Sequence, residues 1–292
     1  MTSSNRSNKP IGLIGAGVMG QCMIRSLREQ GKDVLVYDLN PNIQSLIDEL
    51  GARRVESPKQ LAEQVDIALL SLPGAQHCRE AILGEAGLIH SDHPVIIVNT
   101  STIEPEASRT FAASLPAGWH YLDAPILGRP SALGKWLMPI GGEVRIIEQV
   151  QPVLEVFGKA VPVGEIGSGN ILKALNQLMF TVINAVTSEV LAIAEASGLS
   201  KEVFYETVAS SAAGTVSGLF KEVGRNIVES NFDQPVFTVD LLIKDTSLGL
   251  AIARQLGKPM MIAELVQMNN KYARAKGYGS LDTSALYKVF NE

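Results

Sequence analysis

Short runs of β-branched and aliphatic residues alternate with amphipathic stretches through the first half of the chain. The apolar runs predict strands at residues 10–14, 33–37, 66–72, 94–99, 119–123, 136–140 and 160–163. The amphipathic stretches predict helices at residues 18–30, 43–50, 58–64, 77–83 and 144–157. Strands that alternate with helices of this length need crossover connections, so we expect a parallel, doubly wound sheet.

Helical periodicity takes over after residue 164, and strand signals become rare. Residues 169–198 predict a single long helix that ends at Gly198, a residue suited to a helix C-terminus. Further helices are predicted at residues 201–210, 241–256, 259–275 and 283–290. We therefore predict two domains joined by the long helix. Residues 1–165 form an α/β domain with a flexible tail at 1–9, and residues 166–292 form an all-helical domain.

Composition narrows the classes of partner. Hydrophobic residues make up 46% of the chain and charged residues 19%, which excludes disorder over long stretches. The net charge of −5 comes without a basic block, so neither nucleic acid nor an anionic membrane is an expected partner. No uninterrupted apolar run approaches the length of about 18 residues that spans a bilayer. The two cysteines indicate a reducing compartment, the cytoplasm, and the four histidines lack the spacing of a metal site.

A glycine motif lies between the first predicted strand and helix. Gly15, Gly17 and Gly20 have GxGxxG spacing in this strand–turn–helix context, which is typical of a Rossmann-type dinucleotide site. The first glycine permits a tight turn, the second admits a pyrophosphate, and the third allows close helix–strand packing. A tight turn without a ligand is the alternative. The predicted contact loop comprises Gly15, Ala16, Gly17, Val18, Met19 and Gly20.

The second predicted strand ends at Asp38, 18 residues past Gly20. A carboxylate at this place accepts hydrogen bonds from a ribose 2′-hydroxyl and repels a 2′-phosphate. Neither Leu39 nor Asn40, which follow, offers a cation for that phosphate. The sequence therefore predicts NAD rather than NADP, with Asp38 and Leu39 near the adenosine ribose. The alternative is that Asp38 only caps the following turn.

The long helix carries an uncharged polar stripe beside Lys173. Projected at 100° per residue, a set of polar residues falls near the lysine, and no charged residue occurs between Lys173 and Glu189. A solvent-facing stripe usually contains Lys and Glu, so this one is expected to face a cleft or a protein contact. Burial there would lower the pKa of Lys173 toward the range of acid–base catalysis. The stripe comprises Asn176, Gln177, Thr181, Asn184, Thr187 and Ser188.

Six segments, in order along nearly the whole chain, resemble the β-hydroxyacid dehydrogenase family. They read GLIGAGVMG, SLPGAQHCREAILGEAGL, NTSTIEPEASRTF, YLDAPILGRPSALGKWLMPIGG, GSGNILKALNQ and VDLLIKDTSLGLAIARQLG. The resemblance implies a dinucleotide-binding domain, a helical domain built around the long helix, and a homodimer or homotetramer formed through that helical domain.

The resemblance also implies roles for individual residues. Lys173 matches the catalytic lysine of the family. Ser101 and the loop after Ala124 and Pro125, which contains Gly128, match contacts to the substrate carboxylate, and Gln177 would orient the reacting oxygen. The remaining matches are Asn176 on the substrate side and Leu72, Pro73, Thr102 and Lys244 along the cofactor.

The chain departs from the family pattern in the substrate loop. The usual serine–glycine–glycine is replaced by Leu127, Gly128 and Arg129. Arg129 adds a planar, permanently charged guanidinium suited to an oxyanion, and the pair Gly128–Arg129 resembles the substrate loop of sulfolactaldehyde reductases. Gln177 stands where most members of the family have asparagine, and in this the chain resembles tartronate semialdehyde reductases. An exposed loop residue or an ion pair between subunits is the alternative for Arg129. Asn99 replaces the usual aspartate, which would make the cleft less negative.

Together these features predict an enzyme that transfers a hydride between NAD(H) and a small β-hydroxy acid or its semialdehyde, of the tartronate semialdehyde or 3-hydroxyisobutyrate type. Lys173 would act as general acid and base. The alternative substrate is a sulfonated semialdehyde held by Arg129. Imine reduction and a non-catalytic dinucleotide-binding protein are further alternatives, and the presence of Lys173 argues against both. The predicted partners are a small anionic substrate and further copies of the chain.

Overall fold

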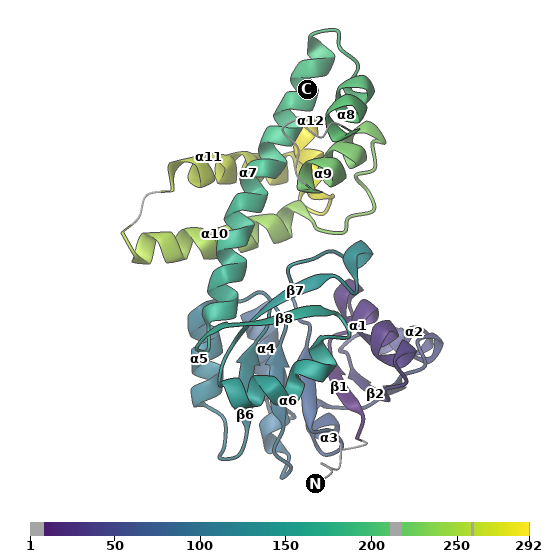
Figure 1. Ribbon diagram of the computed structural model, residues 1–292, viewed down its shortest axis with the longest axis vertical. Helices are drawn as coiled ribbons and strands as arrows, with labels where there is room; N and C mark the ends of the chain where they lie inside the picture. Colours follow the sequence, from purple (N-terminus) through teal and green to yellow (C-terminus); the bar gives the residue numbers. More distant parts are fainter. Residues whose placement is uncertain (1–8, 211–217, 258–259, 292) are drawn as a thin grey trace. The chain divides into compact units, whose positions relative to one another are not determined.

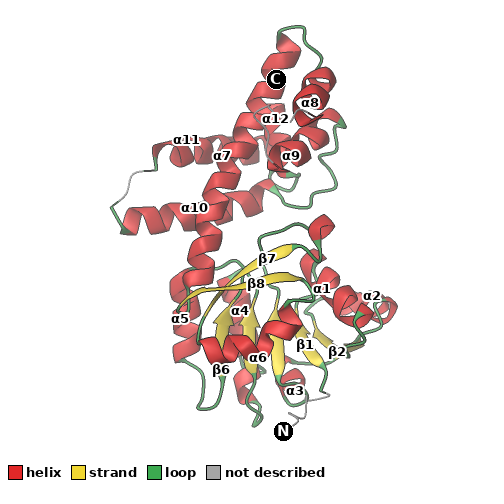
Figure 2. Cartoon of the chain, in the orientation of Figure 1, coloured by secondary structure: helices red, strands yellow, loops and turns green. Residues whose placement is uncertain are grey.

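The structure, a computed structural model, describes residues 9–210, 218–257 and 260–291. Residues 1–8 of the predicted flexible tail, and Pro259 at the start of one predicted helix, lie outside these ranges. The chain divides into two compact units, residues 1–173 and 174–292, where the sequence suggested 1–165 and 166–292. Figures 1 and 2 show an α/β N-terminal unit and a helical C-terminal unit.

The N-terminal unit is built on an eight-stranded sheet of order β3-β2-β1-β4-β5-β6-β7-β8. Paired strands run parallel except β6 and β7, which pair antiparallel. The doubly wound parallel sheet is confirmed, with this one reversal. The strands are β1 (Ile11–Ile14), β2 (Val34–Tyr37), β3 (Arg53–Arg54), β4 (Ile67–Leu70), β5 (Ile96–Asn99), β6 (His120–Asp123), β7 (Trp136–Gly141) and β8 (Gly158–Gly164).

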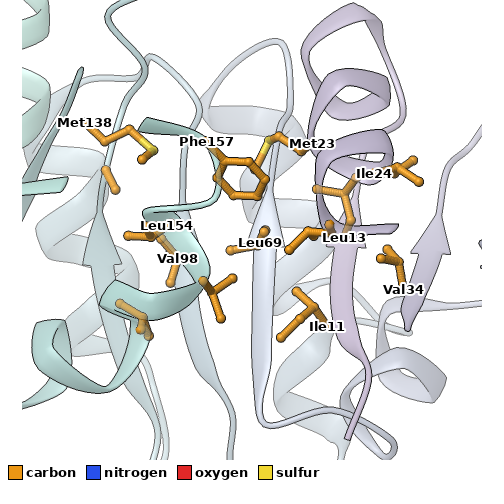
Figure 3. Packing of buried hydrophobic residues seen from close by; sticks show 14 of the residues in the cluster. Ile11, Leu13, Met23, Ile24, Val34, Leu69, Val98, Met138, Leu154 and Phe157 are labelled. Atoms are coloured by element: carbon orange, nitrogen blue, oxygen red, sulfur yellow. The ribbon is translucent and has the colours of Figure 1, made fainter. Parts of the chain in front are cut away.

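Helices cover both faces of this sheet because alternate strand residues are apolar on each face. On one face, Leu13 and Leu69 pack with residues of the flanking helices, among them Met23 and Leu154 (Figure 3). On the other face, Leu70 and its neighbours form a second buried cluster. The helices of this unit are α1 (Val18–Glu29), α2 (Gln44–Glu49), α3 (Pro58–Ala62), α4 (Ala75–Leu83), α5 (Pro105–Ala113) and α6 (Val144–Leu154).

The long helix α7 (Ser168–Ala196) agrees with the prediction in type and length. Gly198 follows it with a φ of +81°, and the N–H of Leu199 bonds back to the carbonyl of Ala194. Glycine is favoured at such a left-handed C-terminal position. The other helices of the C-terminal unit are α8 (Lys201–Ser210), α9 (Gly218–Val228), α10 (Val239–Gln255), α11 (Met261–Ala273) and α12 (Leu286–Phe290).

Among the α-helices and strands of the described residues, β3, α5 and α9 were not predicted from the sequence. In α9, Phe220, Val223 and Ile227 are buried at helical spacing, but Gly224 interrupts the pattern like a helix breaker. The structure explains this glycine, because a Cβ there would lie 2.7 Å from the ring of Tyr205. The glycine makes room for close packing of α8 on α9, at a cost in helix propensity of about 1 kcal/mol.

Candidate functional site

The glycine loop between β1 and α1 has the geometry of a phosphate cradle. Gly15 has a φ of +96°, and a Cβ there would lie 2.3 Å from the carbonyl oxygen of Ser71. A Cβ on Gly20 would lie 2.1 Å from the carbonyl of Gly15, whereas a Cβ on Gly17 would meet nothing within 4 Å. No side chain caps the N-terminus of α1. The loop therefore leaves open backbone and helix N–H groups, which fit the pyrophosphate of a dinucleotide.

Asp38 connects the end of β2 to this loop. Its Oδ2 accepts the N–H of Ala16 at 2.7 Å, and its Oδ1 accepts the N–H of Asn40 at 2.8 Å. Both interpretations of this residue, turn capping and ribose binding, are compatible with these bonds because each carboxylate oxygen has a second lone pair for a hydroxyl. Leu39, which follows, is 76% exposed.

Arg54 is a cation at the same edge that the sequence analysis missed. Its Nη2 donates to the carbonyl of Asp38 at 3.4 Å, and its Nη1 donates to the carbonyl of Pro41 at 3.3 Å. Arg54 does not directly follow β2 in the sequence but comes from β3, the strand that pairs with it. The guanidinium braces the turn that carries Asp38, and it brings a positive charge near the predicted ribose position.

Ser101 lies in the loop after β5 and links two predicted site segments. Its Oγ accepts the N–H of Leu72 at 2.9 Å, and the Sγ of Cys78 lies 3.6 Å away. The hydroxyl thus serves as an acceptor toward the protein backbone and has its own proton for donation. The residue is only 4% exposed, so this loop presents an ordered, nearly covered edge.

Asn99 lies behind Ser101 and is fully buried. Its Oδ1 accepts the N–H of Ser101 at 2.9 Å, and its Nδ2 donates to the hydroxyl of Tyr121 at 2.9 Å. Burial raises the pKa of Tyr121, which keeps the phenol neutral as a partner for the amide.

The substrate loop that contains Gly128 and Arg129 is closed by a pair of bonds between Leu127 and Leu137. The buried indole of Trp136 lies beneath the loop, and its Nε1 donates to the carbonyl of Arg129 at 2.8 Å. A Cβ on Gly128 would lie 2.3 Å from that indole. Trp136 therefore supports the backbone of both predicted substrate residues, a role that its place in the sequence did not reveal.

Lys173 is half-buried and lies one turn into α7. The first turn of this helix is held by Asp123 at the end of β6. The Oδ1 of Asp123 accepts the N–H of Gly167 at 2.7 Å, and its Oδ2 accepts the N–H of Asn170 at 2.8 Å. Burial raises the pKa of Asp123 to about 6, although these hydrogen bonds act in the opposite direction. Neither Asp123 nor Asn170 was predicted as a site residue.

Within the C-terminal unit, one carboxylate connects two predicted site residues. The Nε2 of Gln177 donates to Oδ2 of Asp245 at 3.0 Å, and the Nζ of Lys244 lies 2.9 Å from Oδ1. Asp245 is 3% exposed, so it is not part of a solvated surface pair. Asn176 is half-buried on the same helix as Gln177. Asp245 was not predicted as a site residue, and its place directly after Lys244 in the sequence is the signal that could have pointed to it.

The polar stripe of α7 does not face a cleft over most of its length. Asn270 of α11 donates to Thr181 at 2.8 Å, and Asn184 donates to the carbonyl of Thr283 at 3.0 Å. The stripe is an internal contact of the helical unit. Apolar residues of α7 are exposed instead, with Leu175 at 50% and Met179 at 66%. Of the two expectations for the stripe, a cleft or a protein contact, the structure confirms the second over most of its length.

The remaining residues predicted to contact the cofactor from the N-terminal unit are all at least partly exposed, namely Val18, Met19, Leu72, Pro73 and Thr102. Among the described residues, no group of three His, Cys, Asp or Glu side chains is arranged to hold a metal ion. One described helix, α7, is long and apolar enough to cross a membrane, with 59% of its most apolar window buried. A buried core helix meets the same criterion. The expectation from the sequence concerned uninterrupted apolar runs, and polar residues such as Asn176 and Asn184 interrupt α7.

Comparison with known proteins identifies the family. The model for the NAD-binding domain of 6-phosphogluconate dehydrogenase matches residues 10–167. The model described as the NAD-binding domain of NADP-dependent 3-hydroxyisobutyrate dehydrogenase matches residues 167–290. The chain belongs to the β-hydroxyacid dehydrogenase family. It is therefore an NAD(P)-dependent oxidoreductase of the class that acts on the hydroxyl groups of hydroxy acids.

Relatives within the β-hydroxyacid dehydrogenase family cover nearly all of the chain. The 3-sulfolactaldehyde reductase of Escherichia coli K12 is 31% identical over 283 residues, 94% of each chain. The L-threonate dehydrogenase of the same strain is 31% identical over 288 residues, 96% of this chain and 94% of the relative. A crystal structure of 3-hydroxyisobutyrate dehydrogenase from Salmonella typhimurium has a TM-score of 0.88 at 26% identity, covering 96% and 99% of the two chains.

Proposed function

We propose that this β-hydroxyacid dehydrogenase interconverts a small semialdehyde that bears an acid group and its hydroxy acid, with NAD(H) as coenzyme and Lys173 as general acid and base. One observation supports this most directly. The glycine loop, Asp38 and the Ser101 loop follow parallel strands β1, β2 and β5, and Asp123, which holds the first turn of α7, ends β6. Parallel strands direct their carboxyl ends to one edge of a sheet, where ligands bind in doubly wound folds.

The residues of the chain divide the chemistry as follows. When bound, the nicotinamide ring supplies or accepts the hydride. In reduction, the ammonium of Lys173 donates a proton to the carbonyl oxygen of the substrate. In oxidation, the neutral amine of Lys173 removes the hydroxyl proton. The hydroxyl of Ser101, the backbone at Gly128 and the guanidinium of Arg129 hold the acid group, while Asn176 and Gln177 orient the reacting oxygen. Lys244 is the residue proposed to contact the cofactor from the helical unit.

Replacing the lysine tests this assignment. Lys173→Ala removes the proton donor, so kcat should fall by roughly 10²–10⁴ while the Kd for NADH stays nearly unchanged. Lys159→Ala, at an exposed lysine of β8, is the matched control and should keep full activity. Full turnover by Lys173→Ala would refute the proposed mechanism.

The preference for NAD rests on Asp38. A 2′-phosphate would bring two further negative charges beside this carboxylate, whereas a 2′-hydroxyl donates to it. We expect kcat/KM with NADH to exceed kcat/KM with NADPH. Asp38→Ala should lower the ratio of these two values at least tenfold. Arg54→Ala tests whether the nearby guanidinium contributes to NADPH binding. If Arg54 attracts the 2′-phosphate, its loss should reduce kcat/KM with NADPH more than kcat/KM with NADH. A higher kcat/KM for NADPH in the unaltered enzyme would contradict the assignment.

A sulfonated semialdehyde is the second candidate substrate, and Arg129 is the residue that favours it. A planar guanidinium binds three-oxygen and two-oxygen acid groups by paired hydrogen bonds. NADH oxidation with tartronate semialdehyde, methylmalonate semialdehyde, succinate semialdehyde and sulfolactaldehyde distinguishes the classes. A preference for the sulfonate of tenfold or more in kcat/KM would assign the enzyme to the second class.

We further propose that the enzyme is a cytoplasmic homo-oligomer that associates through its helical unit. Several large apolar residues are exposed on α11, including Leu265 at 62% and Met268 at 65%. Exposed apolar stripes of this kind commonly mark contacts between copies of a chain. Cys22 and Cys78 form no disulfide, which is compatible with a reducing compartment. Fractionation of the native host tests the location.

A further inference from the structure

Three segments that carry proposed site residues converge on one buried side chain, Asn170. The first segment is the loop after β5, with Ser101 and Thr102. The second is the end of β6, which continues into the loop of Gly128 and Arg129. The third is the first turn of α7, which precedes Lys173. Asn170 is fully buried and belongs to that turn.

The amide of Asn170 bonds to each of the other two segments. Its Oδ1 accepts the N–H of Ile103, in the loop after β5, at 3.2 Å. Its Nδ2 donates to Oδ2 of Asp123 at 3.3 Å and to Oγ of Ser108 at 3.1 Å. Both ends of one amide are therefore satisfied by groups from different parts of the sheet edge. An amide flipped or removed would leave a buried donor or acceptor unsatisfied.

Asp123 completes the anchor from the side of β6. It accepts the backbone N–H groups of Gly167 and Asn170, which are among the donors that an α-helix leaves unpaired at its N-terminus. A carboxylate also interacts favourably with the positive end of the helix dipole. The two carboxylate oxygens of Asp123 accept N–H groups from residues that are three apart in the sequence. They therefore fix both the position and the direction of the first turn of α7.

Glycines around the anchor leave little room for displacement. A Cβ on Gly169 would lie 2.5 Å from the carbonyl of Pro139 and 2.6 Å from that of Asp123. A Cβ on Gly141 would lie 2.4 Å from Oδ1 of Asp123. The backbone of α7 thus approaches the sheet as closely as glycine permits. Lys173 follows Asn170 by three residues, less than one turn, so its Cα inherits this position.

We propose that Asn170 and Asp123 are positioning residues that set the amine of Lys173 in register with the loop of Ser101, so that the proton donor meets the substrate oxygen while the acid group is held. The inference rests on the proposed role of Lys173. Correct placement of the amine is expected to matter for the rate, because a displacement of a catalytic group by about 1 Å lowers the rate about 10²-fold.

A double-mutant cycle on the full chain tests the proposal. Asn170→Ala should lower kcat at least tenfold and change the Kd for NADH less than twofold. In a Lys173→Ala background, the same substitution should lower kcat less than twofold further, because its effect acts through the lysine. The primary isotope effect on kcat with 4-deuterated NADH should rise in Asn170→Ala, since hydride transfer becomes slower than product release.

Asn184→Ala is the matched control, because Asn184 is an equally buried asparagine of α7 that bonds to the carbonyl of Thr283. It should lower Tm and leave kcat and the isotope effect unchanged. If Asn170→Ala does not fold, Asn170→Ser, which also loses the bond to Ile103, replaces it in the cycle. Equal losses of kcat in both backgrounds, or no loss in either, would overturn the proposal. No loss of activity in Lys173→Ala would instead remove the proposed function on which it rests.

Discussion

The amide of Asn99 makes two hydrogen bonds next to the site, and a carboxylate could replace only one of them. Asn99 accepts the N–H of Ser101 and donates to Tyr121, whose pKa is raised by burial. An aspartate would accept at both oxygens and face the phenol as a second acceptor unless that hydroxyl turned. From the sequence alone, the expected effect of this residue was a less negative cleft. Its complete burial makes the hydrogen-bond pattern the relevant property.

Arg129 is half-buried and not an exposed loop residue, so Arg129→Ser separates the two remaining alternatives, substrate binding and an ion pair between subunits. Loss of a charge-assisted hydrogen bond costs about 1.5–3 kcal/mol, so KM for the preferred acid should rise roughly 10- to 100-fold. The Kd for NADH should change much less. Arg145→Ser, at an exposed arginine paired with Glu143 on α6, is the control and should leave both constants unchanged. An unchanged KM in Arg129→Ser would place the guanidinium outside the substrate site.

Asp123 predicts a dependence of stability on pH. Its pKa is raised from 3.8 to about 6 by burial, so the folded state binds a proton more tightly than the unfolded state. The stability contributed by this group is present below pH 3.8 and is lost as the pH rises through about 6. The lost contribution corresponds to about 3 kcal/mol of unfolding free energy.

Urea unfolding of the unaltered protein and of Asp123→Asn between pH 4 and 7.5 measures this term. The asparagine does not titrate, so the difference in unfolding free energy between the two proteins should change with pH in that range. Other titrating groups cancel in the difference. A constant difference would mean that the pKa of Asp123 is the same in the folded and unfolded states.

Among the elements, α11 is a helix that the sequence pattern predicts, although the pattern does not tell what the helix packs against. Its buried residues include Val266 and Ala273, while Met261, Leu265, Met268 and Tyr272 recur at helical spacing and are exposed. A helix that is apolar on two faces needs two contacts. One contact is provided within the unit, since Gln267 donates to the carbonyl of Ile243 on α10 at 2.9 Å.

Charges introduced into the exposed stripe should therefore dissociate the proposed oligomer. In Leu265→Glu/Met268→Glu, sedimentation velocity should show a monomer at concentrations where the unaltered protein is a dimer or tetramer, because buried like charges oppose association. Lys271→Glu changes the charge of the same helix outside the stripe and should leave the assembly intact. An unaltered protein that is monomeric would contradict the proposed association.

Long periodic elements were predictable, and short or glycine-containing ones were not. The 29 residues of α7 and the strands of the parallel sheet follow from periodicity. The helix α5 has only Phe111 as a large buried side chain, so its pattern carries little signal. The strand β3 has just two residues and is defined by its pairing with β2. Such elements depend on tertiary contacts, which residue patterns do not express.

In the molecule as a whole, sequence spacing identified the site residues that act through their backbone, such as those of the glycine loop. It did not identify the residues that hold the site segments in place by hydrogen bonds. Asp123, Trp136 and Asp245 act through partners 44, 7 and 68 residues away in the sequence. These contacts arise only when the sheet of the N-terminal unit and the helices of the C-terminal unit have each assembled, and no local pattern marks them.

Coenzyme binding should be visible as local protection within the whole chain. With NADH at 100 times its Kd, the folded protein gains about 2.7 kcal/mol. Hydrogen exchange should slow at residues 15–20, 38–40 and 71–74, where the cradle lies. Segments of α8 and α9, which carry no proposed cofactor contact, serve as the internal reference. Uniform slowing in every segment, or none at the cradle, would contradict the proposed binding site.

The indole of Trp136, which lies under Gly128, restricts how substitutions can change the aldehydes that this enzyme accepts as substrates. Because any side chain at position 128 would collide with Trp136, substitutions there would displace the loop before they met a substrate. Variation in selectivity must then enter through the flanking positions, Leu127 and Arg129. A randomised library over the three codons, selected on a new aldehyde, should return diverse residues at the outer two and glycine between them.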